Sequence, residues 1–130
     1  MMDRSIALLG AVLLLSSACN KEPGEGGRAE IRGNVYEQRY FGTGNPDGDP
    51  QPLPDHRVYI IYGDGDFYDD DLRTGPNGLF VFRWLRKGDY RIYVVSECQG
   101  SGCTKILSRD VTISDKKEVV NVGSFTVENW

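Results

Sequence analysis

The sequence predicts an all-β domain, an antiparallel β-sandwich of about seven strands, and three observations support this fold class. Large apolar residues recur at every second position in several short runs, as in strands whose successive side chains point to opposite faces. Turns rich in glycine, proline and aspartate separate these runs at close spacing. The sequence contains no internal repeat and no segment with the apolar period of an amphipathic helix.

The most regular part of the sequence is residues 74–95, TGPNGLFVFRWLRKGDYRIYVV, which predict two strands joined by a tight link. Its turns contain glycine, proline and asparagine, which suit the backbone angles of tight turns. The core-facing side chains of this segment are expected to be Phe80, Phe82, Leu85, Tyr90, Ile92 and Val94. Burying each such side chain contributes about 1.5–3 kcal/mol, so this segment is the expected centre of the fold.

Two strands are expected before this segment. Residues 30–40 alternate in character and predict the first strand, and residues 56–62, HRVYIIY, predict the second. The connection between them, residues 41–55, holds four prolines and three glycines and is expected to be irregular. Residues 63–71, GDGDFYDDD, predict an acidic loop, and residues 72–74 a short strand.

The part of the chain after the central segment predicts further short strands. Residues 104–108 and 111–113 are β-rich pieces, and residues 114–117 form a turn. Residues 119–127, VVNVGSFTV, predict the last strand or pair of strands. A glycine inside a strand pattern often marks a bulge, and a bulge is therefore expected at Gly123.

The N-terminal residues 1–18 predict a signal peptide, with Arg4 before an apolar run at residues 6–15. That run is shorter than the roughly 20 residues that span a bilayer. Small residues and then Cys19 follow, so the segment resembles a bacterial lipoprotein signal, although Ser16 replaces the usual large apolar residue. The resemblance implies cleavage before Cys19 and a lipid on its sulfur, and plain secretion is the alternative.

The residue after Cys19 is Asn20. In lipoproteins of Gram-negative bacteria an aspartate here favours the inner membrane, so the resemblance implies the outer membrane, on its periplasmic side or at the cell surface. Residues 19–28 are expected to form the lipidated cysteine and a flexible, Gly/Pro-rich tether, followed by a folded domain at residues 29–130.

The formal net charge is −4, and the sequence shows no basic stripe. Nucleic-acid binding depends on clustered lysine and arginine, so nucleic acid is not an expected partner. Contact with the membrane is expected through the lipid rather than through the protein surface.

Cys98 and Cys103 are the two cysteines that remain after Cys19. In an exported chain, cysteines this close most simply form a disulfide that closes a tight loop. Two free thiols are the alternative. A metal pair has less support, since the chain has one histidine and no other cysteine.

The order of the strand motifs resembles the carboxypeptidase regulatory-like domain, a transthyretin-like (prealbumin-type) β-sandwich with Greek-key topology that is related to the B-type repeats of bacterial surface adhesins. The residues that support this resemblance are Gly33-Asn34-Val35, Pro52-Leu53, Val58-Tyr59-Ile60, Thr74, Gly78-Leu79-Phe80-Val81-Phe82, Leu85 and the segment 88–94. The resemblance implies a fold and not an activity.

We expect neither catalysis nor a bound cofactor. His56 is the only histidine, whereas enzymes of the transthyretin-like group use at least two. No G-x-S-x-G nucleophile motif occurs, and His56 is interpreted as a surface residue at a strand edge.

Two further groups of residues are candidate sites. The first is a calcium site in the acidic loop, since Ca²⁺ takes 6–8 oxygen ligands and the adhesin repeats bind calcium. Its candidate ligands are Asp64, Asp66, Asp69, Asp70 and Asp71, and a solvated acidic loop is the alternative. The second is a glycan-stacking or protein-contact surface with the candidates Tyr59, Tyr68, Trp84 and Tyr93. These aromatic residues could instead simply cover the sheet faces.

The expected function is that of a non-enzymatic, lipid-anchored protein of the cell envelope with a structural, adhesive or partner-binding role. The alternative is a carbohydrate-binding accessory lipoprotein of a polysaccharide-uptake system. The expected partners are the membrane, through the lipid, and an envelope protein or a surface glycan.

Overall fold

The computed structural model describes residues 22–130, so the predicted signal peptide and Cys19 lie outside the described residues. Residues 22–130 contain strands and no helix that could cross a membrane. The strands are β1 (Glu25–Arg39), β2 (Gln51–Pro52), β3 (Arg57–Tyr62), β4 (Asp70–Arg73), β5 (Leu79–Leu85), β6 (Gly88–Glu97), β7 (Thr104–Ile113) and β8 (Val119–Asn129).

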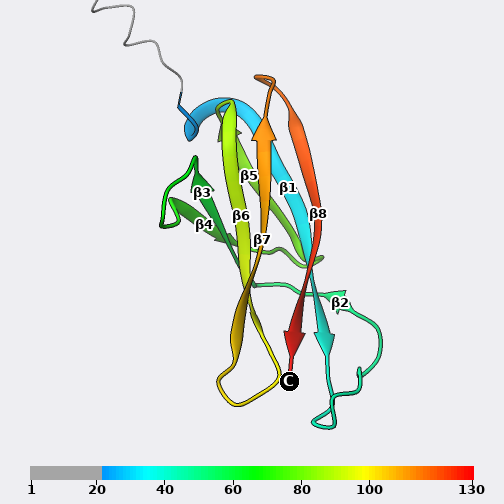
Figure 1. Cartoon of the computed structure of the whole chain (residues 1–130). Coiled ribbons are helices and arrows are strands. Elements are labelled where there is room, and N and C mark those ends of the chain that lie inside the picture. The colour runs from blue at the N-terminus through cyan, green and yellow to red at the C-terminus, as the bar shows by residue number, and fades with distance from the viewer. Residues whose placement is uncertain (1–21) are drawn as a thin grey trace, which may run out of the picture.

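These strands form one mixed sheet that curls into a half-barrel (Figure 1). The strand order is β2-β1-β8-β6-β3-β4, with β5 paired to β1 on the side away from β8, and β7 paired to β6. The half with β5, β1 and β8 therefore faces the half with β7, β6, β3 and β4 across the core. The predicted all-β, sandwich-like fold class is confirmed.

The two halves join where β6 meets β8, through the single residue pair Glu97 and Glu128. The Ser96 hydroxyl is buried here, accepts a hydrogen bond from the Glu128 backbone N–H at 2.8 Å, and donates one to the Glu97 carbonyl at 2.7 Å. Lys105 of β7 forms an ion pair with Glu128 beside this junction. The hydroxyl thus supplies a partner that the short β-ladder lacks.

The strand pairing differs from the sequence prediction in one respect, because β1 and β8 are parallel rather than antiparallel. β7 follows β6 as an antiparallel neighbour, and a turn then reverses the chain into β8. Instead of continuing beside β7, β8 crosses to the other half of the sheet and runs in the same direction as β1 (Figure 1). The period-two pattern indicates which residues form strands, but not which strands become neighbours.

The bulge predicted at Gly123 is present. Arg32 pairs with Asn121 and Asn34 with Ser124, so two residues of β8 lie opposite Gly33 alone. Gly123 has a φ of 82°, which favours glycine. A Cβ on Gly33 would lie 2.6 Å from the Gly123 carbonyl oxygen. The bulge therefore requires glycine at both positions, at Gly33 for space and at Gly123 for its backbone angle.

The core lies between the two halves of the sheet. All six side chains expected there from the central segment are buried, and Tyr90 is the largest fully buried one. The other members of the core cluster are Ala29, Ile31, Val35, Val58, Ile60, Val111, Ile113, Phe125 and Val127. Phe80 contacts both Phe82 and Phe125 through its ring, which links β5 to β8.

Several predicted boundaries need correction. β1 begins at Glu25, inside the predicted tether, because the chain there folds back on β5: Glu25 and Ala29 both lie opposite Leu85. A Cβ on Gly27 would overlap the Leu85 carbonyl oxygen, so this glycine allows close packing rather than flexibility. The two pieces predicted at residues 104–113 form one strand, β7, since each of its residues pairs with β6.

Candidate functional site

The outer face of the half-sheet β7-β6-β3-β4 carries a cluster of tyrosines. Val58, Ile60, Ile92 and Val94 point into the core, so the alternating Tyr59 and Tyr93 point outward. The two tyrosines are directly opposite in the β3–β6 pairing, and their rings stack with centroids 4.7 Å apart and an interplanar angle of 10°. Ser108 of β7 lies opposite Tyr93 on its other side, with a side chain too small to cover that ring.

Two further side chains extend this cluster. The Tyr68 ring lies 4.9 Å from that of Tyr59 at a tilted angle. The Arg57 guanidinium lies 5.1 Å from the Tyr59 ring centre and 5.7 Å from that of Tyr68. We refer to Tyr59, Tyr68, Tyr93 and Arg57 as the aromatic platform. Three of the four aromatic candidates from the sequence thus come together.

The surroundings shift the pKa values of two platform residues, Arg57 and Tyr93. The Asp71 carboxylate accepts a hydrogen bond from Arg57 Nε at 2.6 Å and holds the pKa of Arg57 above its ordinary value. Partial burial raises the pKa of Tyr93 most, and the neighbouring Tyr59 and Tyr68 raise it further. The Tyr93 phenol therefore stays neutral and the Arg57 guanidinium stays charged and paired with Asp71.

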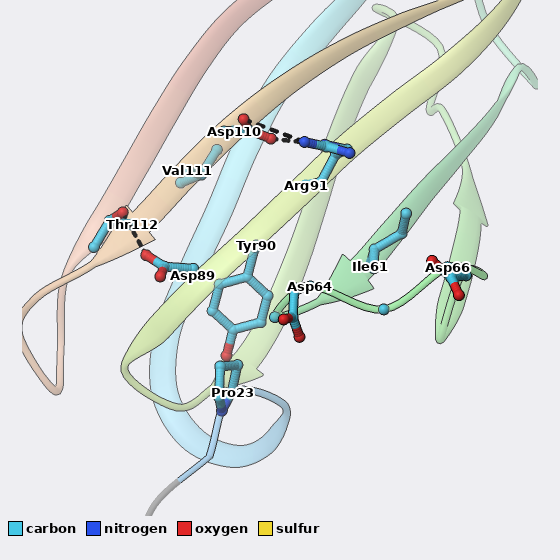
Figure 2. Close-up of a pocket in the computed structure, with 12 residues that line it drawn as sticks. Pro23, Ile61, Asp64, Asp66, Asp89, Tyr90, Arg91, Asp110, Val111 and Thr112 are labelled. Atoms are coloured by element: carbon cyan, nitrogen blue, oxygen red, sulfur yellow. Dashed lines mark hydrogen bonds and ion pairs between the residues drawn. The ribbon is translucent and has the colours of Figure 1, made fainter.

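A pocket of about 550 Å³ lies on the same face of the sheet as the platform, and Figure 2 shows residues that line it. Ile61 and Arg91 line this pocket. Ile61 lies two residues after Tyr59 on β3, and Arg91 lies two residues before Tyr93 on β6, so each is about 7 Å from that tyrosine and on the same face of the sheet. Four carboxylates also line this acidic pocket: Asp64, Asp66, Asp89 and Asp110. Platform and pocket thus form one continuous surface.

The carboxylates in the acidic pocket are not equivalent. Asp110 accepts hydrogen bonds from Arg91 at 2.7 and 3.4 Å, and this interaction holds the pKa of Asp110 below its ordinary value (Figure 2). Asp89 accepts a hydrogen bond from the Thr112 hydroxyl at 2.7 Å. Within residues 22–130, the Asp64 and Asp66 side chains are exposed and accept no hydrogen bond. These two carboxylates are available to a ligand that carries hydroxyl or amino groups.

The structure does not bring the five calcium candidates together. Asp69 accepts a hydrogen bond from the Tyr62 backbone N–H, Asp70 from that of Asp71, and Asp71 is paired with Arg57. In the described part of the chain, no three His, Cys, Asp or Glu side chains form a group that could hold a metal ion. The acidic loop instead uses three of its carboxylates to fix its own backbone and the platform.

The remaining predicted residues lie elsewhere. Trp84, the fourth aromatic candidate, is on β5 in the other half of the sheet, 67% exposed, and makes no ring contact with the platform within residues 22–130. His56 Nε2 lies 3.1 Å from the Val95 carbonyl oxygen, just before β3. Cys98 and Cys103 are joined by a disulfide that closes the β6–β7 loop.

Sequence reasoning missed the polar half of this site. Asp89, Arg91 and Asp110 belong to β6 and β7 and are far apart in sequence from the loop that holds Asp64 and Asp66. The alternation of Asp89 and Arg91 with buried residues indicates an outward face, but only the strand pairing brings that face beside the loop. Arg57 was likewise not predicted, although its position two residues before Tyr59 places it on the same face.

The fold and the site define an all-β domain with a polar and aromatic surface on one sheet face. No protein-family model matches the chain, and no curated protein matches its sequence. Among solved structures, the chain is similar to a protein from Pseudomonas aeruginosa described as a candidate carbohydrate-binding protein. The two chains are 17% identical with a TM-score of 0.48, over 89% of this chain and 96% of the other. A similarity of this size does not transfer a ligand, so a functional inference has to rest on the site itself.

Proposed function

We propose that this chain is a non-enzymatic binding module that takes a carbohydrate on the aromatic platform and in the acidic pocket. The stacked pair Tyr59 and Tyr93 is the observation that carries this proposal. A sugar ring has apolar C–H faces that pack on aromatic rings, and its hydroxyl groups donate hydrogen bonds to carboxylates. The platform supplies the rings, and Asp64 and Asp66 supply the acceptors in the adjoining acidic pocket.

The charges of the site favour neutral or amino sugars. Four carboxylates line the acidic pocket, against one arginine that is already paired with Asp110. A uronic acid or a sulfated sugar would be repelled there, because like charges brought together in a partly desolvated site cost free energy. Arg57 is also paired, with Asp71, and offers an anion no free positive charge.

The test is to titrate neutral, amino and acidic oligosaccharides into the purified protein and to follow binding by calorimetry. We expect neutral or amino sugars to bind, and Tyr93→Ala to weaken binding at least about tenfold, since loss of an aromatic anchor commonly costs more than about 1.4 kcal/mol, which is a factor of ten in affinity. Tyr40→Ala is the matched control, because Tyr40 stacks on Trp130 outside this site. If Tyr93→Ala and Tyr40→Ala bound the sugar with equal affinity, the aromatic platform would be ruled out as the binding surface.

A second candidate function, docking of a partner protein, is favoured by one observation. Ile106 on β7 is 64% exposed and lies opposite the exposed Val95 on the platform face. β7 is also an edge strand, which could pair with an extended segment of a partner. Crosslinking in intact cells separates the two functions: a stoichiometric protein adduct that Ile106→Asp abolishes and Tyr93→Ala retains would favour the partner protein.

The proposal includes anchoring of the module to the cell envelope, in the outer membrane, through a lipid on Cys19. The lipoprotein-like signal and Asn20 after the cysteine support this part. Metabolic labelling with a palmitate analogue tests it. We expect the label on the wild-type protein and its loss in Cys19→Ser, and an unlabelled wild-type protein would exclude the anchor.

A further inference from the structure

A second pocket, of about 520 Å³, lies at the end of the molecule where the chain enters β1. The β5–β6 and β7–β8 connections meet there (Figure 1). Its charged lining residues are Arg28, Arg86, Lys87, Lys116 and Lys117, and no carboxylate lines it. We refer to it as the basic pocket. It shares no lining residue with the acidic pocket.

Among residues 22–130, the five cations of the basic pocket have no ion-pair partner. Within residues 22–130, six other arginine and lysine side chains are paired with carboxylates, and none of those six lines this pocket. The Arg86 Nε atom is buried and has no hydrogen-bond partner among the described residues. Five unpaired cations around one cavity, in a chain of net charge −4, indicate a site for an anion.

The backbone builds this pocket. β1 loops outward between Glu25 and Ala29, which both lie opposite Leu85, and Gly27 passes directly over the Leu85 carbonyl. The Arg86 backbone N–H donates a hydrogen bond to the Gly24 carbonyl at 2.8 Å. These contacts bring Arg28 next to Arg86 and Lys87, so the cations are held together by the fold.

The proposed lipid anchor would place this end of the molecule at the membrane. The structure shows Pro23 and Gly24 already packed on the domain, so at most four residue steps separate Cys19 from the fold. Fully extended, four steps span about 14 Å. The basic pocket would then lie within reach of the phospholipid headgroups.

We propose that the basic pocket binds the phosphate groups of membrane phospholipids and docks the anchored domain onto the bilayer, an inference that rests on the proposed anchor. Arginine and lysine suit phosphate, and each basic residue near an anionic surface adds to the attraction. Trp84 lies next to Leu85 and is exposed, and tryptophan favours the interface between membrane and water. Pro23 also lines the acidic pocket, so both pockets lie near the proposed anchor, and an anionic surface attracts the basic pocket and repels the acidic one.

Docking is measurable on the mature lipidated protein, reconstituted into vesicles that contain a headgroup-labelled fluorescence quencher. With Trp130→Phe as background, Trp84 is the only tryptophan. We expect its fluorescence to be quenched in phosphatidylglycerol vesicles and much less in phosphatidylcholine vesicles. Lys116→Gln with Lys117→Gln should lower the ratio of docked to undocked protein about fivefold for each cation removed. Arg39→Gln with Lys105→Gln, which removes the same charge away from the pocket, should leave quenching unchanged.

Two results would overturn the proposal: equal quenching in the two lipids, or equal quenching in the Lys116/Lys117 variant and its control. Equal quenching in the two lipids together with binding of inorganic phosphate to the purified protein would assign the pocket to free phosphate instead. Flotation with phosphatidylcholine vesicles tests the anchor separately, because only the lipid attached to Cys19 can hold the protein on these vesicles. Failure to float there, with Trp84 still quenched by phosphatidylglycerol, would exclude the anchor and support the basic pocket.

Discussion

The hydroxyl of Tyr90 accepts a hydrogen bond from the Gly24 backbone N–H at 2.8 Å, across 66 residues of sequence. The same hydroxyl donates to the Arg86 carbonyl at 2.6 Å, and burial raises its pKa. One buried phenol thus ties the start of the chain to the β5–β6 link. This contact makes the segment before β1 part of the domain and shortens the expected tether.

Replacing Tyr90 by phenylalanine tests this contact. Tyr90→Phe would leave the Gly24 N–H and the Arg86 carbonyl without their partner, and we expect a loss of about 1–3 kcal/mol in the free energy of unfolding. Faster amide hydrogen exchange at Gly24 should accompany it. Tyr62→Phe is the control, because the Tyr62 hydroxyl makes no hydrogen bond within the described residues. Unchanged exchange at Gly24 would contradict the assigned role.

The packing of the central segment is tested at Phe82, which is 4% exposed and contacts Phe80. Phe82→Ala removes a large ring from between the two halves of the sheet, and we expect a loss of about 3–5 kcal/mol, enough to prevent folding of a marginal domain. Leu79→Ala, on the opposite face of β5, should cost much less. Denaturant unfolding measures the free energy of unfolding of both variants. Similar losses in Phe82→Ala and Leu79→Ala would show that Phe82 is not part of the core.

The junction of the two half-sheets should respond to pH through Glu128. The hydrogen bond from Lys105 is the main reason that the pKa of Glu128 lies below its ordinary value of 4.5, and the hydrogen bond from Trp130 lowers it further. A carboxylate whose pKa is lower in the folded state stabilises the fold above the unfolded pKa, and this contribution is lost as pH falls through the folded pKa. Since the pair is partly exposed, the effect should stay within the 0–1 kcal/mol or so of surface ion pairs.

Melting temperatures from neutral to acid pH, compared between wild type and Glu128→Gln, measure this effect. We expect the variant to be slightly less stable at neutral pH and to lose less stability on acidification. Asp66→Asn, which removes an exposed carboxylate without a partner among residues 22–130, should follow the wild-type curve. Parallel curves for wild type and Glu128→Gln would show that the ion pair does not contribute.

Part of the site could be predicted from the sequence, because alternation places Tyr59 and Tyr93 on the face opposite to buried residues of the same strands. That these tyrosines stack on each other depends on the register of β3 and β6, which residue pattern alone leaves open. The same limit applies to the basic pocket. Its cations come from three segments, each too short to form a basic stripe in the sequence.

The sequence by itself determined that the chain is all-β, where most strands lie, which side chains of residues 74–95 fill the core and that a bulge lies at Gly123, because these follow from local pattern and residue chemistry. The tertiary structure decided the parallel pairing of β1 with β8, the packing of Gly24 and Gly27 on the domain, and the separation of acidic and basic pockets. Each of these depends on contacts between residues distant in the chain, and such contacts leave no periodic signal in the sequence.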